Sequence, residues 1–189
     1  MNQRLVFLVE TAIFAAIALL LDYVSNIFGR LPQGGSLSLA MIPIFIMAFR
    51  WGLKGGLLTG FLTGLLQIVL GLAVIVHWAQ YLLDYPLAYA LLGASGLFSR
   101  WVLRASGSRQ KGAVILSVLA ATFIGSLLRL ASHVLSGIIF FASSTPKGTP
   151  VFLYSVVYNS SYMIPSWIVS SIVIIMVLIS APTLLNRKK

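Results

Sequence analysis

Cysteine is absent from the 189-residue chain, and acidic residues number only three. Without cysteine, the chain can form neither disulfide bonds nor thiolate metal sites, and thiol catalysis is excluded. Charged residues of both signs make up 8% of the chain, which is too few to cover the surface of a soluble domain. Hydrophobic residues instead make up 59%. This balance predicts an integral membrane protein that forms a single transmembrane domain over residues 1–189.

Apolar runs of membrane-spanning length recur from end to end and predict an all-α bundle of six transmembrane helices. The runs are Leu5–Phe28, Leu37–Phe49, Leu53–Val76, Trp78–Phe98, Ala113–Phe141 and Val151–Leu178. The second run is short for a full span and could be tilted, re-entrant or partly extended. The first run resembles a signal peptide, but Glu10 interrupts it and no convincing cleavage site follows, so we expect a retained helix.

The net charge of +10 is distributed in a way that indicates membrane topology. The connections on one side of the predicted bundle carry Arg4, Arg50, Lys54, Arg100, Arg104, Arg109, Lys111, Arg187, Lys188 and Lys189. The connections on the other side carry Arg30 and Lys147. Because basic residues are enriched on the cytoplasmic side of membrane proteins, both termini are predicted to be cytoplasmic. The excess charge therefore orients the protein in the lipid bilayer and does not indicate nucleic-acid binding.

Small residues recur at every fourth position in two of the predicted helices. They are Gly52, Gly56, Gly60 and Gly64 in the third span, and Ala12 and Ala16 in the first. Such stripes let helix backbones approach closely where lipid removes the usual hydrophobic driving force. The glycine stripe predicts a packing face between helices. The alanine stripe also fits helix packing, although its partner could be another protein.

Three acidic residues lie inside the predicted spans, where a charge at the helix centre costs roughly 2.5–3.5 kcal/mol. Glu10 and Asp22 are near the two ends of the first span, where a headgroup or a neighbouring base explains them. Asp84 lies deeper, within the stretch YLLDYPLAY. Two interpretations of Asp84 stay open, a functional carboxylate and a structural pair with Arg129.

The fifth span carries Gly125, Arg129, His133, Gly137 and Phe141 at intervals of four residues, so they share one helix face. Helix packing explains the glycines but not a cation and an imidazole on the same stripe. A histidine within the membrane is either a hydrogen-bonded core residue or a ligand contact. The three polar and aromatic side chains in register leave both interpretations of His133 open.

The sixth span begins with tyrosines at intervals of four residues, Tyr154, Tyr158 and Tyr162, with Asn159 beside them. Tyrosines at a membrane boundary are commonly interfacial residues, but an amide that faced lipid would have no hydrogen-bond partner. By the predicted topology, three helices can direct a carboxylate, an imidazole, an amide and several rings to one place in the outer half. These side chains are Asp84, His133, Phe141, Tyr154 and Asn159.

An unmatched carboxylate among aromatic rings suits a flat cation, because ring faces attract positive charge by up to ~2 kcal/mol in a dry site. Amide and hydroxyl groups can bind the heteroatoms at the edge of a ring. A phosphate would need several convergent basic residues, and the outer side offers only Arg30 and Lys147. These residues predict a pocket, open to the outside, for a small cationic heteroaromatic solute.

At these residues the chain resembles the thiamine-specific substrate-binding (S) components of energy-coupling factor transporters, the ThiT/YuaJ family. The resemblance runs from RLVFLVETAIFAAIA to APTLL through LPQGGSLSLAMIPIFIMAFRWGLKGG, LLDYPLAY, HVLSGIIFF and PKGTPVFLYSVVYN. It implies a six-helix protein of the bacterial cell membrane that binds thiamine near the outer face. It also implies delivery of thiamine inward with a transmembrane coupling protein and two ATPases as partners.

The resemblance also implies roles for individual residues. The thiamine contacts of the family fall on Asp84, Tyr85, His133, Gly137, Phe141, Tyr154 and Asn159, and its docking motif for the coupling protein falls on Ala12 and Ala16. Asp84 stands where family members carry glutamate, and Phe141 where they carry tryptophan. An aromatic of the first outer loop is replaced within Gln33–Ser36. These departures could alter the affinity or the preferred vitamer, and Tyr81 or Tyr89 could compensate.

Other functions are weighed against this one. An S component for a different vitamin is one alternative, and an autonomous proton-coupled carrier is another, although no inverted repeat is visible. An enzyme is not expected, since two histidines and three scattered acids supply neither an activated nucleophile nor a metal site. The sequence contains no phosphate-binding loop of the G-x-x-x-x-G-K-[ST] type. We therefore expect no cofactor on this chain and ATP use by partner ATPases only.

Overall fold

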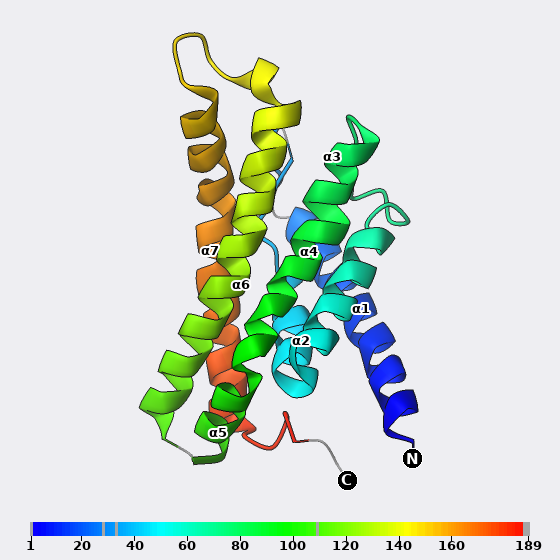
Figure 1. The fold of residues 1–189 in the computed structure, drawn as a ribbon, viewed down its shortest axis with the longest axis vertical. Coiled ribbons are helices and arrows are strands. Elements are labelled where there is room, and N and C mark those ends of the chain that lie inside the picture. The colour runs from blue at the N-terminus through cyan, green and yellow to red at the C-terminus, as the bar shows by residue number, and fades with distance from the viewer. Residues whose placement is uncertain (1, 28, 33, 109, 187–189) are drawn as a thin grey trace.

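The computed structural model describes residues 2–27, 29–32, 34–108 and 110–186 (Figure 1). Every regular element in these ranges is helical. Four helices are long and apolar enough to cross a membrane, namely α1 (Gln3–Ile27), α2 (Met41–Leu66), α6 (Lys111–Phe140) and α7 (Val151–Ser180). In lipid, a helix satisfies its backbone hydrogen bonds within one segment, so apolar runs of this length become helices. The prediction of an all-α membrane protein is confirmed.

Helix α2 contains the second predicted span and the start of the third, and the chain reverses between them at Gly52. Gly52 has φ +72° and ψ −161°, which are not helical values and which glycine adopts without steric strain. A Cβ atom added to Gly56 would collide with that of Ala48, whereas eight residues of straight helix are about 12 Å apart. Gly52 therefore forms a turn and is not helical, but it keeps its predicted place in the packing stripe, because a Cβ atom added to Gly96 would meet the backbone of Gly52.

The third predicted span was extended too far, because helix α2 ends at Leu66 and not at Val76. A turn follows at Gly71, whose φ is +63°. Beyond it, the backbone N–H and carbonyl groups of Val74 form hydrogen bonds with the side chains of Tyr85 and Gln80. They therefore cannot take part in the backbone hydrogen bonds of a continuing helix. These residues form part of the wall of the cavity described below.

From Trp78 to Ser108 the chain is helical but irregular. The successive elements are α3 (Trp78–Leu82), the π-helical η1 (Leu83–Leu87), α4 (Ala88–Leu91), the 3₁₀-helical η2 (Leu92–Phe98) and α5 (Ser99–Ser108). Pro86 lies within η1 and lacks the N–H that a regular helix needs, which favours a locally widened turn. The fourth predicted span coincides with α3 to η2. Asp84 lies in the widened turn.

The count of six spans stays a prediction, since two predicted spans share α2 and a third occupies this irregular stretch. The first turn of α1 and the last turn of α7 lie at the same end of the molecule, as an even number of crossings requires (Figure 1). Phe28, which ends the first predicted span, lies outside the described residues. The same is true of the basic residues Arg109, Arg187, Lys188 and Lys189.

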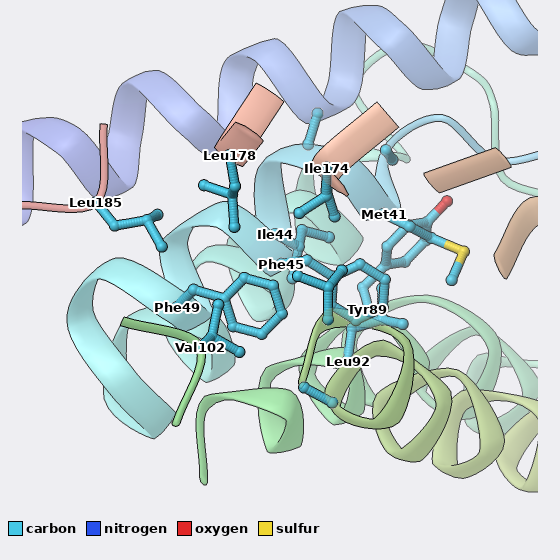
Figure 2. Close-up of a cluster of buried hydrophobic side chains, with 14 of the residues drawn as sticks. Met41, Ile44, Phe45, Phe49, Tyr89, Leu92, Val102, Ile174, Leu178 and Leu185 are labelled. Carbon is cyan, nitrogen blue, oxygen red and sulfur yellow. The ribbon is translucent and has the colours of Figure 1, made fainter. Parts of the chain in front are cut away.

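The core forms around α2, and Figure 2 shows Phe45 and Phe49 of this helix in one cluster with Ile174 and Leu178 of α7. The glycine stripe packs as predicted. Added Cβ atoms at Gly56, Gly60 and Gly64 would meet backbone atoms of Gly93, Tyr89 and Tyr85, respectively. The irregular stretch is thereby held against α2 at backbone distance, which fixes the position of Asp84 opposite α6.

Candidate functional site

One cavity gathers all seven residues assigned to ligand contact at the sequence level. It encloses about 850 Å³ of space, including solvent at its open side. The predicted residues in its lining are Asp84, Tyr85, His133, Gly137, Phe141, Tyr154 and Asn159. Their roles in binding stay predictions. The exposed residues Ala12 and Ala16 lie outside its described lining, on the outer surface of α1.

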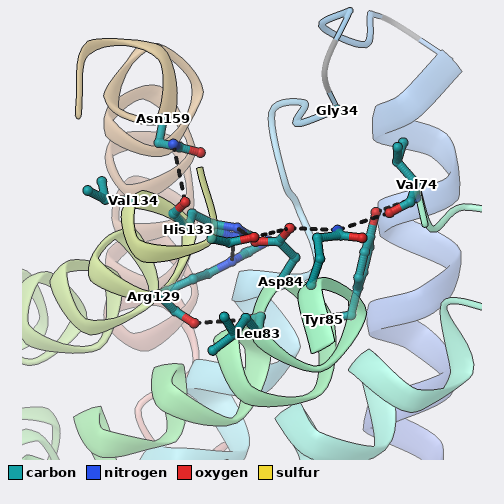
Figure 3. Close-up of polar contacts among 12 residues, drawn as sticks. Gly34, Val74, Leu83, Asp84, Tyr85, Arg129, His133, Val134 and Asn159 are labelled. Atoms are coloured by element: carbon teal, nitrogen blue, oxygen red, sulfur yellow. Dashed lines mark hydrogen bonds and ion pairs between the residues drawn. The ribbon is translucent and has the colours of Figure 1, made fainter. Parts of the chain in front are cut away.

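Asp84 is held in the cavity by three hydrogen bonds. Its Oδ2 atom accepts from Gln80 Nε2 at 2.7 Å and from Ser136 Oγ at 2.8 Å. Its Oδ1 atom lies 3.0 Å from His133 Nδ1, a contact visible in Figure 3. An ionised carboxylate only accepts hydrogen bonds, so the three neighbours of Asp84 match the acceptor capacity of its two oxygen atoms.

The charge of His133 follows from its other neighbour. Arg129 donates through its Nε–H to His133 Nε2 at 3.3 Å. An Nε2 atom that accepts a hydrogen bond carries no proton, so the proton is on Nδ1 and is donated to Asp84. His133 is therefore neutral in this arrangement. Among the described residues, Asp84 has no cationic partner, and the predicted direct pair with Arg129 is replaced by a link through the imidazole.

Asn159 is fixed by neighbours on both sides of its amide. Its Nδ2 group donates to the carbonyl oxygens of Ser155 at 2.8 Å and His133 at 3.4 Å. Its Oδ1 atom accepts from the Tyr162 hydroxyl at 2.5 Å. Both amide hydrogens are thus used, and the capacity left for a ligand is the second lone pair of Oδ1. Asn159 can accept a hydrogen bond from a ligand N–H group.

Aromatic rings surround these polar groups. The centroids of Tyr154 and Tyr158 are 5.9 Å apart, and those of Tyr158 and Tyr162 are 6.3 Å apart. The ring of Tyr162 also meets that of His133 edge-on at 6.0 Å. Tyr81 and Tyr89 are the two tyrosines that could compensate for the departures from the family pattern. Tyr89 lines the cavity, and Tyr81 is not in its described lining.

Two loops close the rim through side chains that line the cavity. Tyr85 Oη accepts from Val74 N at 2.6 Å, and Gln80 Nε2 donates to Val74 O at 3.0 Å. On the other side, Tyr158 Oη donates to Gly34 O at 2.9 Å. The outer loop Arg30–Ser36, whose glycine, proline and serine residues predict a flexible lid, contributes Arg30, Gly34, Gly35 and Ser36 to the lining. Gln33 lies outside the described residues, and the role of this loop as a lid stays a prediction.

Sequence reasoning missed Gln80 and Ser136, and it interpreted Asp22 wrongly. Asp22 is only 5% exposed, and its hydrogen-bond partners among the described residues are the neutral side chains of Ser38, Gln67 and Tyr89. It is bonded to neutral side chains at the inner end of the cavity. The spacing along α1 indicates this burial, because Asp22 lies on the same helix face as the buried residues Ala15 and Ala18. Glu10 does pair with a neighbouring base, as expected, through two 2.7 Å contacts to Arg50.

Comparison with known proteins places the chain in a family. A family model described as "Thiamine transporter protein (Thia_YuaJ)" matches residues 8–186. The chain belongs to this family. It is 53% identical to the thiamine transporter ThiT of Bacillus subtilis strain 168 over 191 aligned residues, which cover 100% of both chains.

More distant relatives agree with this family assignment. The thiamine transporter ThiT of Lacticaseibacillus paracasei is 30% identical, with 99% of this chain and 94% of the relative covered. A solved structure of ThiT from Listeria monocytogenes superposes with a TM-score of 0.90 at 32% identity, covering 97% of this chain and 99% of that one. The family is one of transporters and not of enzymes. With its apolar helices, the chain is a multi-pass protein of the cell membrane.

Proposed function

We propose that the chain binds thiamine at the outer face of the membrane as the S component of an energy-coupling factor importer. The observation that carries this proposal is the state of Asp84, an anion held by three neutral donors in a ring-lined cavity. The thiazolium ring of thiamine is a flat cation and supplies the missing positive charge. The relatives named as thiamine transporters support the same ligand.

Each part of thiamine has a counterpart in the cavity under this proposal. Asp84 balances the thiazolium charge, and Phe141, where α6 ends, stacks on the ring. His133 supports the ring from the side of Arg129. Asn159 and Tyr154 bind the edge atoms of the pyrimidine. Gly137 lets α6 pack directly on α7, since a Cβ atom there would collide with the Ser155 hydroxyl.

Transport in this proposal depends on partner proteins. The lack of a phosphate-binding loop assigns ATP hydrolysis to separate ATPases. Ala12 and Ala16 dock on the coupling protein, a role that rests on the family resemblance. Their exposed position on α1 beside Leu8 (56% exposed) and Ile13 (51% exposed) is compatible with a partner helix. Six spans with both termini in the cytoplasm complete the proposal, supported by the distribution of basic residues.

The proposal is tested by titrating purified protein with thiamine, thiamine phosphates and riboflavin. We expect tight binding of thiamine, and a loss of about 2–5 kcal/mol in Asp84→Asn, because removing one partner of a buried charge pair leaves the other unpaired. Asp84→Glu is the matched control, since it keeps the charge and should retain most of the affinity. Equal affinity of wild type and Asp84→Asn for thiamine would contradict the assigned role, and preferential binding of riboflavin would contradict the ligand.

A further inference from the structure

Asp22 is a second buried carboxylate in the lining of the cavity, and the proposed contacts with thiamine make no use of it. Its Oδ1 atom accepts from Ser38 Oγ at 2.8 Å. Its Oδ2 atom accepts from Gln67 Nε2 at 2.9 Å and from the Tyr89 hydroxyl at 3.0 Å. Like Asp84, it is surrounded by three neutral donors, which match the acceptor capacity of an ionised carboxylate.

Arg129 lies between the two carboxylates and is only 4% exposed. Toward Asp22, its Nη1 donates to Ser38 Oγ at 3.3 Å, and its guanidinium carbon lies 4.1 Å from the centroid of the Tyr89 ring. Both Ser38 and Tyr89 donate in turn to Asp22. Toward Asp84, the guanidinium donates to the neutral His133, which in turn contacts the carboxylate. One buried cation is therefore linked through neutral groups to two carboxylates, Asp22, which is buried, and Asp84, which is partly buried.

The buried charges do not cancel. Asp22 and Asp84 contribute two negative charges and Arg129 one positive charge, which leaves one net negative charge. Arg30 also lines the cavity, where it donates to the Leu72 carbonyl oxygen and contacts the Tyr85 hydroxyl, but its side chain is exposed, so solvent and salt screen its charge. A site of low dielectric with one uncompensated anion attracts a ligand of charge +1. Charges that do not touch the ligand also contribute to that attraction.

We propose that Asp22 is the counter-ion of Arg129, and that its charge sets the preference of the cavity for singly charged cations. Asp22 thus acts at a distance, by neutralising Arg129 so that the charge of Asp84 is left for the ligand. This inference rests on the proposed function, because it presumes that the cavity receives thiamine. It adds a determinant of specificity that lies outside the proposed thiamine contacts.

The test compares two ligands of equal shape and different charge. One is thiamine, and the other is the neutral isostere in which carbon replaces the thiazolium nitrogen (3-deazathiamine). The quantity measured is the ratio of their dissociation constants, neutral over cationic, with purified full-length protein. In Asp22→Asn, we expect this ratio to fall about tenfold, equivalent to about 1.4 kcal/mol. A structural defect would weaken both ligands together and leave the ratio unchanged, which would overturn the proposal.

A second variant, which removes a positive charge instead of a negative one, tests the proposal independently. Arg129→Gln should raise the ratio, because it leaves two buried anions without a cation, and the double variant should return it toward the wild-type value. If Asp22→Asn does not fold, Arg129→Gln alone decides, and an unchanged or lower ratio overturns the proposal. Glu10→Gln is the control, because it removes a carboxylate from the same helix outside the described lining of the cavity.

Failure of the inference differs from failure of the proposed function. Wild-type protein that does not bind thiamine contradicts the proposed function and the inference with it. Wild-type protein that binds thiamine tightly, but binds the neutral isostere equally well, retains a thiamine site and overturns the inference alone. Tight binding of thiamine with opposite shifts of the ratio in the two variants supports both.

Discussion

At the residue scale, the neighbours of Asn159 determine what its amide can offer to a ligand. Because Nδ2 donates to the carbonyl oxygens of Ser155 and His133, rotation of the amide by a half turn would place Oδ1 against two acceptors. The two carbonyl oxygens therefore keep Oδ1 on the side of the Tyr162 hydroxyl, as an acceptor toward the cavity. The exocyclic amino group of the thiamine pyrimidine is a matching donor. Tyr162 was noted in the sequence only as one of three tyrosines on a helix face.

We expect Tyr162→Phe to weaken thiamine binding by about 1 kcal/mol, the net contribution of a typical hydrogen bond. Discrimination against oxythiamine, in which a carbonyl replaces the amino group, should be kept, since the carbonyl oxygens of Ser155 and His133 still orient the amide. Calorimetric titration with both ligands measures the two effects. Tyr23→Phe is the control, because that tyrosine is 50% exposed on α1. Lost discrimination in Tyr162→Phe would show that the hydroxyl, and not the two carbonyl oxygens, orients Asn159.

At the scale of elements, the glycines of α2 determine how closely the irregular helical stretch Trp78–Ser108 can pack against α2. Gly56, Gly60 and Gly64 place helix backbone directly on the backbone of residues 85–93, without intervening side chains. This close contact holds η1 and its widened turn in place. The carboxylate of Asp84 consequently projects toward α6 instead of toward lipid.

Gly60→Ala should lower the free energy of unfolding in detergent by about 1–3 kcal/mol, because the new Cβ atom would collide with the carbonyl of Tyr89. Gly112→Ala is a matched control in α6, where an added Cβ atom has no neighbour within 4 Å. That change should leave stability unchanged or raise it by up to about 1 kcal/mol, since alanine favours helix. Reversible unfolding monitored by circular dichroism measures both variants. Equal effects of the two substitutions would contradict the close-packing account.

At the scale of the whole molecule, binding and transport are assigned to different surfaces. Ala12 and Ala16 are exposed on α1, and neither residue is in the described lining of the cavity. A change on this face therefore leaves the ligand contacts intact. The proposed coupling protein would meet the chain there.

We expect Ala12→Trp to abolish thiamine uptake in cells while leaving the dissociation constant unchanged, because the indole would obstruct a close helix contact. Ile172→Trp is the control, since Ile172 is also about half exposed, on α7 (50%). Normal uptake by Ala12→Trp would refute docking through this face. Accumulation of thiamine in liposomes by the purified chain alone, driven by a proton gradient, would favour the autonomous carrier instead.

Several features of the site could be predicted because they follow from periodicity along one helix. Arg129, His133 and Gly137 share a face of α6, and Tyr154 and Asn159 lie at the start of α7, so sequence spacing alone brought them toward a common region. The partners of Asp84 could not be predicted in this way. Ser136 and Gln80 lie on different elements. Each contacts Asp84, and these contacts depend on the position that the widened turn of η1 gives to the carboxylate.

By itself, the sequence determined that this protein is helical and embedded in lipid, because hydropathy and backbone hydrogen bonding act over short stretches of chain. Only the tertiary structure decided which charges are paired. Asp22, Asp84 and Arg129 come from three separate segments, and each is bonded through neutral groups that pattern did not single out. Electrostatic energy depends on distances in space, so the uncompensated charge of the cavity is a property of the fold.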